Sequence, residues 1–247
     1  MDRLIYTAMT GASHILQQQA AVSENLSNTN TPGFRAAINT FRAVPVEGPG
    51  LPTRVMVVDS VVGADFTPGS MEPTGRDLDV AIDGKGWIAV QSGDGKEAYT
   101  RNGSFQVTTN GILQTRSGLN VLGDNGPITL PPNAEVSIAK DGTIMATPSG
   151  GKTAEAVRVG RIKLTNPPES QLARGEDGLF RMRDGSAAAA DGKVRVVSGN
   201  LESSNVSAVE AMVNMISLAR QFDTQMKMLQ TADNNSKSAS QLLNING

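Results

Sequence analysis

Cysteine is absent from this 247-residue sequence, and histidine occurs once, at His14. A chain without cysteine has no disulfide framework and no thiolate that could serve as a nucleophile or a metal ligand. With a single histidine, His-based nucleophilic triads, Cys–His dyads and His- or Cys-rich zinc sites are hard to build. We therefore expect no catalytic, cofactor-binding or metal-binding residue, and we interpret His14 as a solvated or interface residue of a helix.

An excess of charge of one sign is also missing. The 22 lysines and arginines nearly balance the 24 aspartates and glutamates, so no global electrostatic field favours nucleic acid or an anionic membrane. The N-terminus has no apolar run long enough for the core of a signal peptide or for a transmembrane span. We expect no nucleic-acid partner, no membrane insertion and, if the protein leaves the cytoplasm, a route without a cleaved general secretion signal.

Glycine and proline are scarce at both ends of the chain. Before residue 31 the only such residue is Gly11, and apolar or small residues recur in steps of four and three, as they do along one face of a helix. The Pro32-Gly33 pair that follows is a stop signal, because Pro32 disfavours the α conformation before it and Gly33 readily takes φ > 0. The pattern predicts a helix from about residue 2 to residue 27.

The C-terminal end predicts a second, longer helix. Ser207 stands three residues before Glu210, a capping-box pattern that marks a helix start. A helix from Ala208 to about Leu243 is roughly 54 Å long at a rise of about 1.5 Å per residue. Its apolar stripe turns polar after Leu229, so we expect the last part to order only on assembly. The stripe consists of Ala208, Met212, Met215, Ala219, Phe222, Met226 and Leu229.

The middle of the chain has a different character. Five prolines fall between residues 34 and 75, which predicts an extended connector, residues 32–76, with at most one or two strands. Short apolar runs then alternate with Asp-Gly and Asn-Gly turn signals, which predicts a central all-β domain over residues 77–200. The fold class is therefore α+β, with the terminal helices of residues 1–31 and 201–247 paired as a coiled coil.

A search for reactive groups finds little. Asp77, Asp79 and Asp83 could form a carboxylate pair for glycoside hydrolysis or hold a cation, but they sit beside turn glycines, where capping roles are favoured. The Gly84-Lys85-Gly86 segment resembles part of a phosphate loop, yet it lacks the third glycine and the strand-to-helix context. We predict a structural protein and no enzyme, and we keep a carboxylate-based hydrolase as the alternative.

Four segments resemble signatures of the bacterial flagellar rod and hook proteins. Residues 21–34, AVSENLSNTNTPGF, are similar to the N-terminal signature, and residues 199–206, GNLESSNV, with the helix that follows, to the C-terminal one. Residues 78–84, LDVAIDG, and residues 99–105, YTRNGSF, resemble central motifs of the same family. The resemblance covers nearly the whole chain, and the four motifs occur in the order of the family.

The resemblance implies a structural subunit. The chain resembles most the members that form the proximal rod and adjoin the distal rod, in its opening residues, in Trp87-Ile88 and in its length. A distal-rod or hook-type subunit is the alternative. Such subunits are exported through the flagellar type III apparatus and assemble in the periplasm into a helical drive shaft that transmits torque to hook and filament. The implied partners are copies of the chain, other proximal and distal rod subunits, and the export apparatus; no cofactor is implied.

The terminal helices are the predicted assembly interface. They would pair with each other and with neighbouring copies, because a long helix cannot bury its own stripe. Three alternatives stay open: amphipathic helices on an ordinary core, a rod-associated wall hydrolase, and a monomeric export chaperone or cap. The predicted interface residues are Leu4, Ile15, Val22 and Leu26 on the first helix, and Met212, Ile216, Phe222, Met226 and Leu229 on the second.

Overall fold

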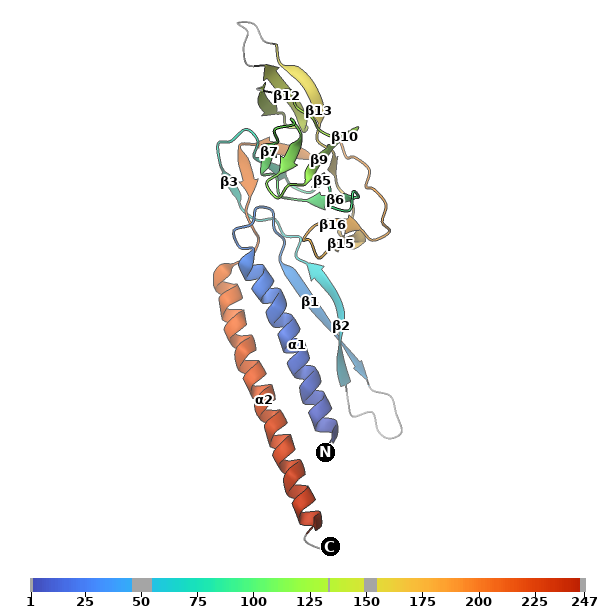
Figure 1. Ribbon diagram of the computed structural model, residues 1–247, viewed down its shortest axis with the longest axis vertical. Helices are drawn as coiled ribbons and strands as arrows, with labels where there is room; N and C mark the ends of the chain where they lie inside the picture. The colour runs from blue at the N-terminus through green and yellow to red at the C-terminus, as the bar shows by residue number, and fades with distance from the viewer. Residues whose placement is uncertain (1, 46–54, 133, 149–154, 245–247) are drawn as a thin grey trace. The chain divides into compact units, whose positions relative to one another are not determined.

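The computed structural model describes residues 2–45, 55–132, 134–148 and 155–244 (Figure 1). The chain divides into two compact units. Met1–Ser27, Ala37–Gly63 and Ser207–Gly247 form the helical unit, and Asn28–Ala36 with Ala64–Val206 form the β unit. Two helices and a large β-sheet domain confirm the predicted α+β class.

The helical unit contains helix α1 (Asp2–Ser27), helix α2 (Ala208–Asn244), and strands β1 (Ala37–Pro45) and β2 (Val55–Ala64). The two helices lie side by side and run in opposite directions, and β1 packs on α1 (Figure 1). The bounds of α1 coincide with the predicted range. Helix α2 continues to Asn244, so the polar residues after Leu229 do not end it.

The exit from α1 is a pair of consecutive turns. The backbone N–H of Thr31 donates to the carbonyl of Asn28 (3.1 Å), and that of Phe34 donates to the carbonyl of Thr31 (3.2 Å). Gly33 has a φ of 68°, and a Cβ at this position would collide with the backbone of Arg101. Both the turn and the close approach therefore require glycine here, while the helix itself already ends at Ser27.

The β unit is built from many short antiparallel strands. Its largest sheet has nine strands and follows the order β15-β16-β6-β5-β9-β8-β7, with β10 paired to β9 and β14 paired to β5. A three-stranded sheet, β11-β12-β13, and the pairs β17-β4 and β18-β3 complete the unit. The strands are β3 (Met71–Pro73), β4 (Val80–Asp83), β5 (Trp87–Gln91), β6 (Glu97–Thr100), β7 (Phe105–Val107), β8 (Leu113–Thr115), β9 (Asn120–Gly123), β10 (Gly126–Pro127), β11 (Ala134–Ile138), β12 (Thr143–Pro148), β13 (Val157–Arg161), β14 (Leu164–Thr165), β15 (Leu172–Arg174), β16 (Phe180–Met182), β17 (Arg195–Ser198) and β18 (Asn200–Glu202).

The predicted connector, residues 32–76, is shared between the two units. Its β1–β2 hairpin falls with the helices, whereas residues 64–76 fall with the β strands. Its described residues form three strands, whereas the sequence predicts at most two. The additional strand is Met71–Pro73, which pairs with Asn200–Glu202, a strand that precedes α2 in the sequence. A three-residue strand of this kind has no local signal, since its partner lies at the other end of the chain.

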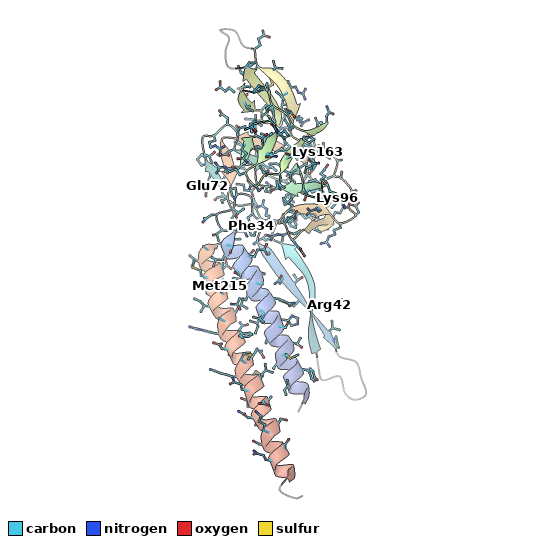
Figure 2. The ribbon with its side chains drawn as sticks, in the orientation of Figure 1. Phe34, Arg42, Glu72, Lys96, Lys163 and Met215 are labelled. Atoms are coloured by element: carbon cyan, nitrogen blue, oxygen red, sulfur yellow. The ribbon has the colours of Figure 1, made fainter. Side chains whose placement is uncertain are left out.

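The core of the β unit has two clusters on opposite faces of β5. Ile88 and Val90 belong to one cluster, with Phe105 and Leu113. Trp87 and Ala89 belong to the other, with side chains from β6, β15 and β16. Because alternate residues of a strand point to opposite faces, a strand buried on both sides is apolar throughout. This explains the uninterrupted Trp-Ile-Ala-Val run, and Figure 2 shows how densely side chains fill this unit.

The helical unit buries much less apolar surface. Several of its buried side chains are alanines, among them Ala8, Ala12, Ala211 and Ala232, with Ile15 and Leu218 as the larger members. Within the described residues, no helix is both long enough and apolar enough to cross a membrane. Large exposed apolar side chains are frequent on the two helices: Tyr6, Met9, Leu16, Val209, Met212, Val213, Ile216, Met226 and Met228.

Candidate assembly surface and motif junction

The seam of α2 is a heptad pattern on one face. Its buried and half-buried positions alternate in steps of four and three, as residues on one helix face do. Gln225 lies on this face and packs over Gly11 of α1, where an added Cβ would lie 3.3 Å from the amide carbon. Met215, labelled in Figure 2, is half-buried in the same row. The seam positions are Ala211, Met215, Leu218, Phe222, Gln225, Leu229, Ala232 and Ser236.

The predicted interface residues separate into two groups. Phe222 and Leu229 lie on the seam of α2. On α1, Ile15 is buried and Val22 and Leu26 are half-buried, while the side chain of Leu4 lies outside the described residues. The remaining three, Met212, Ile216 and Met226, are exposed.

Met212, Ile216 and Met226 lie outside the α1–α2 seam, because their side chains are exposed. The apolar stripe predicted from the sequence includes Met212 and Met226, whereas the structure places Ala211 and Gln225 at the seam beside them. A prediction from hydrophobicity chooses Met212 over its neighbour Ala211, and Met226 over its neighbour Gln225. Close packing of Gln225 over Gly11 of α1 favours a different row. As contacts to neighbouring copies, the three exposed residues stay a prediction.

An exposed apolar patch covers the first turns of α2. Val209, Met212, Val213 and Ile216 are 73%, 53%, 60% and 56% exposed. They stand at positions i, i+3, i+4 and i+7, so they share one face of the helix. We call these four residues the α2 patch. Contiguous exposed apolar side chains on a soluble protein mark an interaction surface.

Helix α2 begins directly before this patch, and Ser207 precedes its first residue. The hydroxyl of Ser207 accepts a hydrogen bond from the backbone N–H of Glu210 (3.4 Å), and its carbonyl accepts one from the N–H of Ala211 (2.9 Å). Ser207 therefore caps the helix one residue before its first turn. Glu210 also places a negative charge in this turn, where the helix dipole favours it.

The N-terminal signature also contributes to the helical unit. The side chain of Asn25, near the end of α1, donates to the carbonyl of Ala37 (3.0 Å) and accepts from its N–H (2.7 Å). This amide therefore satisfies both polar groups of the first residue of β1. His14 lies further back on α1, where its ring packs edge-on against Phe41 of β1 with centroids 5.4 Å apart.

Glu202 is the centre of a buried charge cluster in the β unit. Its carboxylate lies 2.6 Å from Nη2 of Arg35 and 3.0 Å from Nη1 of Arg101, and it accepts the N–H of Gly69 at 3.1 Å. The three charged side chains are at most 6% exposed. Burial lowers the pKa of Arg101, and the nearby charge of Arg35 lowers it further, whereas Glu202 raises it.

Asn205 completes this junction with backbone contacts. Its side chain accepts the N–H of Ala36 (2.8 Å) and donates to the carbonyls of Asp65 (2.9 Å) and Thr67 (3.0 Å). The carbonyl of Glu202 accepts the N–H of Gly33 (2.7 Å). The segments that lead from α1 to β1, from β2 to β3 and from β18 to α2 are therefore held together by one set of polar groups.

No local pattern of residues singles out this junction. Arg35 directly follows the N-terminal signature, and Arg101 and Glu202 lie inside two of the other motifs. The sequence does contain one hint of the ion pairs. Three separate motifs each contain or adjoin one charged residue, and two of these residues are arginines and the third is a glutamate. Their proximity depends on long-range folding, which no local pattern predicts.

Asp79, a member of the hypothetical carboxylate pair, has a structural role. It is 1% exposed, and its Oδ1 accepts hydrogen bonds from Arg76 (2.9 Å) and from the hydroxyl of Ser104 (3.2 Å). Its carbonyl accepts the N–H of Gly199 (2.8 Å). Asp83 lies exposed at the end of β4. Asp79 thus joins both central motifs to the C-terminal one.

Comparison with known proteins agrees with this arrangement of motifs. Residues 5–35 match the family model described as Flagella basal body rod protein, and residues 81–146 match Flagellar hook protein FlgE/F/G D1 domain. Residues 197–242 match Flagellar basal body rod FlgEFG protein C-terminal. Each matched range contains at least one residue of the junction or of the seam.

Full-length relatives carry the same description. The chain is 51% identical to Flagellar basal-body rod protein FlgF of Escherichia coli (strain K12), over 99% of this chain and 100% of the relative. It is 48% identical to the FlgF of Salmonella typhimurium over the same shares, and 30% identical to Flagellar basal-body rod protein FlgG of Bacillus subtilis over 94% and 96%. The chain therefore belongs to the family of flagellar basal-body rod proteins, which are structural proteins of the flagellar basal body.

Proposed function

We propose that the chain is a structural subunit of the proximal rod, where copies of it join neighbouring proximal and distal rod subunits in a helical drive shaft. In this role it transmits motor torque toward hook and filament. The FlgF relatives match at 51% and 48% identity against 30% for the FlgG of Bacillus subtilis, which supports the FlgF type of subunit. Assembly with other rod proteins accords with the family.

The α2 patch is the observation that carries this proposal. Each of its four side chains would gain about 1–2 kcal/mol if its exposed part were buried. The sum is of the same order as the cost of fixing two molecules relative to each other, about 4–15 kcal/mol. One patch alone is therefore too small for a stable pair. A subunit that contacts several neighbours at once satisfies this condition, as in a helical lattice built from contacts that do not close into a ring.

Pairing of α1 and α2 as a coiled coil belongs to the same proposal. The seam of α2 repeats in steps of four and three over eight positions, which is the pattern of a coiled-coil face. Small residues on α1, among them Gly11 and Ala12, permit close approach of the helices. Such a pair leaves the α2 patch on another face, available to a neighbouring copy.

The remaining parts of the proposal concern route and chemistry. The chain reaches the periplasmic rod through the flagellar type III apparatus. It acts without catalysis, because Asp79, which a hydrolase would need free, is committed to Arg76 and Ser104. A peptidoglycan zymogram of the purified protein with no cleared zone is the expected result, and clearing that disappears in Asp79→Asn would contradict the non-enzymatic role.

A matched pair of substitutions tests the assembly role. Ile216→Lys places a charge on the α2 patch, whereas Val157→Lys places the same charge at an equally exposed position of the β unit; the two residues are 56% and 58% exposed. In cells that lack the native copy, we expect Ile216→Lys to be missing from purified basal bodies and Val157→Lys to be present. Normal incorporation of Ile216→Lys would refute the assignment of the patch.

A further inference from the structure

A pocket of about 580 Å³ opens beside the Glu202 cluster in the β unit. Arg35 and Arg101 form its buried lining, and their side chains are at most 6% exposed. The side chain of Lys85, also in the lining, is 82% exposed. Its apolar lining comes from two aromatic rings, packed edge-to-face at 6.0 Å, and three prolines. These apolar residues are Phe66, Trp87, Pro68, Pro167 and Pro168.

The pocket has a surplus of one positive charge. Its lining and the cluster behind it contain three cations, Arg35, Lys85 and Arg101, and two carboxylates, Glu169 and Glu202. Glu169 is exposed and lies 3.5 Å from Lys85, a pair that water and salt weaken. The buried part is less balanced, because two guanidinium groups share the single carboxylate of Glu202.

Two arginines of the pocket lining carry buried N–H donors that lack an acceptor. Among the described residues, Nε and Nη1 of Arg35 and Nε of Arg101 have no hydrogen-bond partner. Buried donors are almost always paired in folded proteins, and each unpaired donor is costly. Arg101 already donates to the carbonyl of Gly84 through Nη2 (2.7 Å) and to Glu202 through Nη1. The two arginines of the lining therefore have more N–H donors than the site has hydrogen-bond acceptors for them.

We propose that this pocket binds the carboxylate of an acidic side chain from a neighbouring protein subunit. One negative charge cancels the surplus of one, and a carboxylate matches the planar fork of a guanidinium group better than a point charge does. The proline and aromatic lining suits the methylene stem that carries such a carboxylate. The neighbouring subunit as its source rests on the proposed function in the rod; the carboxylate chemistry rests on the pocket alone.

Trp87 allows a direct binding measurement. It is the only tryptophan of the chain and lines the pocket, so its fluorescence reports on this site. We expect a saturable change when the full-length protein is titrated with N-acetyl-glutamate N-methylamide at constant ionic strength. The matched N-acetyl-glutamine N-methylamide has no charge and should give none. An equal response to both compounds, or no response to either, would overturn the proposal.

Two variants with a control sharpen this test. Arg101→Gln removes the surplus charge but leaves Arg35 paired with Glu202, so we expect affinity to fall by at least about tenfold. Lys85→Gln changes an exposed residue and should weaken binding by about threefold, whereas Lys96→Gln, at an exposed position outside the lining (Figure 2), should not. Unchanged affinity of a folded Arg101→Gln variant for the glutamate compound would contradict the proposal. If Arg101→Gln does not fold, unchanged affinity of Lys85→Gln would contradict it.

The source of the carboxylate is tested in cells by a photo-crosslinking residue at position 85. We expect a crosslink to an acidic segment of a rod protein. A crosslink to cell-wall glycan, or none, would overturn the proposal provided that the same residue placed at position 216 crosslinks to a rod protein. If neither position yields a rod protein, the proposed function itself fails, even where the binding experiment succeeds.

Discussion

The carboxylate of Glu202 lies 2.6 Å from a guanidinium nitrogen of Arg35, although the two residues come from opposite ends of the chain. Arg35 belongs to the segment between α1 and β1, and Glu202 to the strand that precedes α2 by a few residues. The ion pair is almost completely buried. The segment that follows α1 and the strand that precedes α2 are therefore held together within the β unit by this one contact.

Glu202→Gln should strongly destabilise the β unit. It leaves two buried guanidinium groups without a counter-charge, a change that typically costs about 3–5 kcal/mol. Glu72→Gln is the matched control. Glu72 is exposed on β3 (Figure 2), and in the antiparallel pairing of β3 with β18 it lies opposite Leu201, the residue before Glu202. Urea unfolding followed by Trp87 fluorescence gives both values. Equal stability of the two variants would show that the cluster contributes little.

Tyr99→Phe should weaken the β unit and change its pH dependence. The Tyr99 hydroxyl donates to Glu97 (2.9 Å) and accepts the N–H of Ala188 (2.6 Å), so its loss leaves a buried N–H unpaired at a cost of about 1–3 kcal/mol. Burial raises the pKa of Tyr99 to about 12, with the hydrogen bond to Glu97 as a smaller cause in the same direction.

The sign of the pH effect follows from the raised pKa. Below pH 10 the hydroxyl is protonated in the folded and the unfolded chain, and its contribution to stability is complete. Between pH 10 and about 12 only the unfolded chain loses the proton, so the folded state is progressively destabilised. Thermal melts over this range should fall more steeply for the native protein than for Tyr99→Phe, and parallel curves would contradict the assignment.

Gly33→Ala should destabilise the turn that follows α1. Gly33 has a φ of 68°, and a Cβ there would collide with the backbone of Arg101. We expect a loss of about 1–3 kcal/mol. Gly93→Ala is the control, because a Cβ at Gly93 meets no atom within 4 Å. A melting temperature of Gly33→Ala equal to that of the control would show that the turn can adjust.

The sequence predicts the helices well because their signals are local. The cap at Ser207 and the apolar periodicity of α1 depend only on neighbouring residues, and the observed bounds lie within a residue of those expected. The run from Trp87 to Val90 indicates a buried strand for the same reason. Sequence motifs of the family locate the segments that later meet in the β unit, without showing that they meet.

The seam and the junction could not be predicted in the same way. The seam uses Ala211 and Gln225 in preference to the more apolar Met212 and Met226, because close packing against Gly11 decides which face turns inward. Glu202 finds Arg35 and Arg101 only after the intervening strands have paired. Both features depend on contacts between residues far apart in the sequence, which periodicity and propensity do not contain.

Removal of residues 208–247 should leave the β unit folded. Both of its hydrophobic clusters and the Glu202 junction are formed by residues outside α2. We expect the shortened chain to keep a cooperative melt of Trp87 fluorescence and to be absent from basal bodies. A chain that loses this transition would show that α2 is needed for the fold of the β unit as well as for assembly.

Electron cryomicroscopy of isolated basal bodies would show whether the α2 patch is buried in the assembled rod. We expect density for this subunit in the rod, with Val209, Met212, Val213 and Ile216 of each copy buried against a neighbouring subunit. The α1–α2 seam should keep the row through Met215 and Phe222. A rod in which the four side chains of the α2 patch face solvent in every copy, while other surfaces make all contacts between subunits, would contradict this expectation.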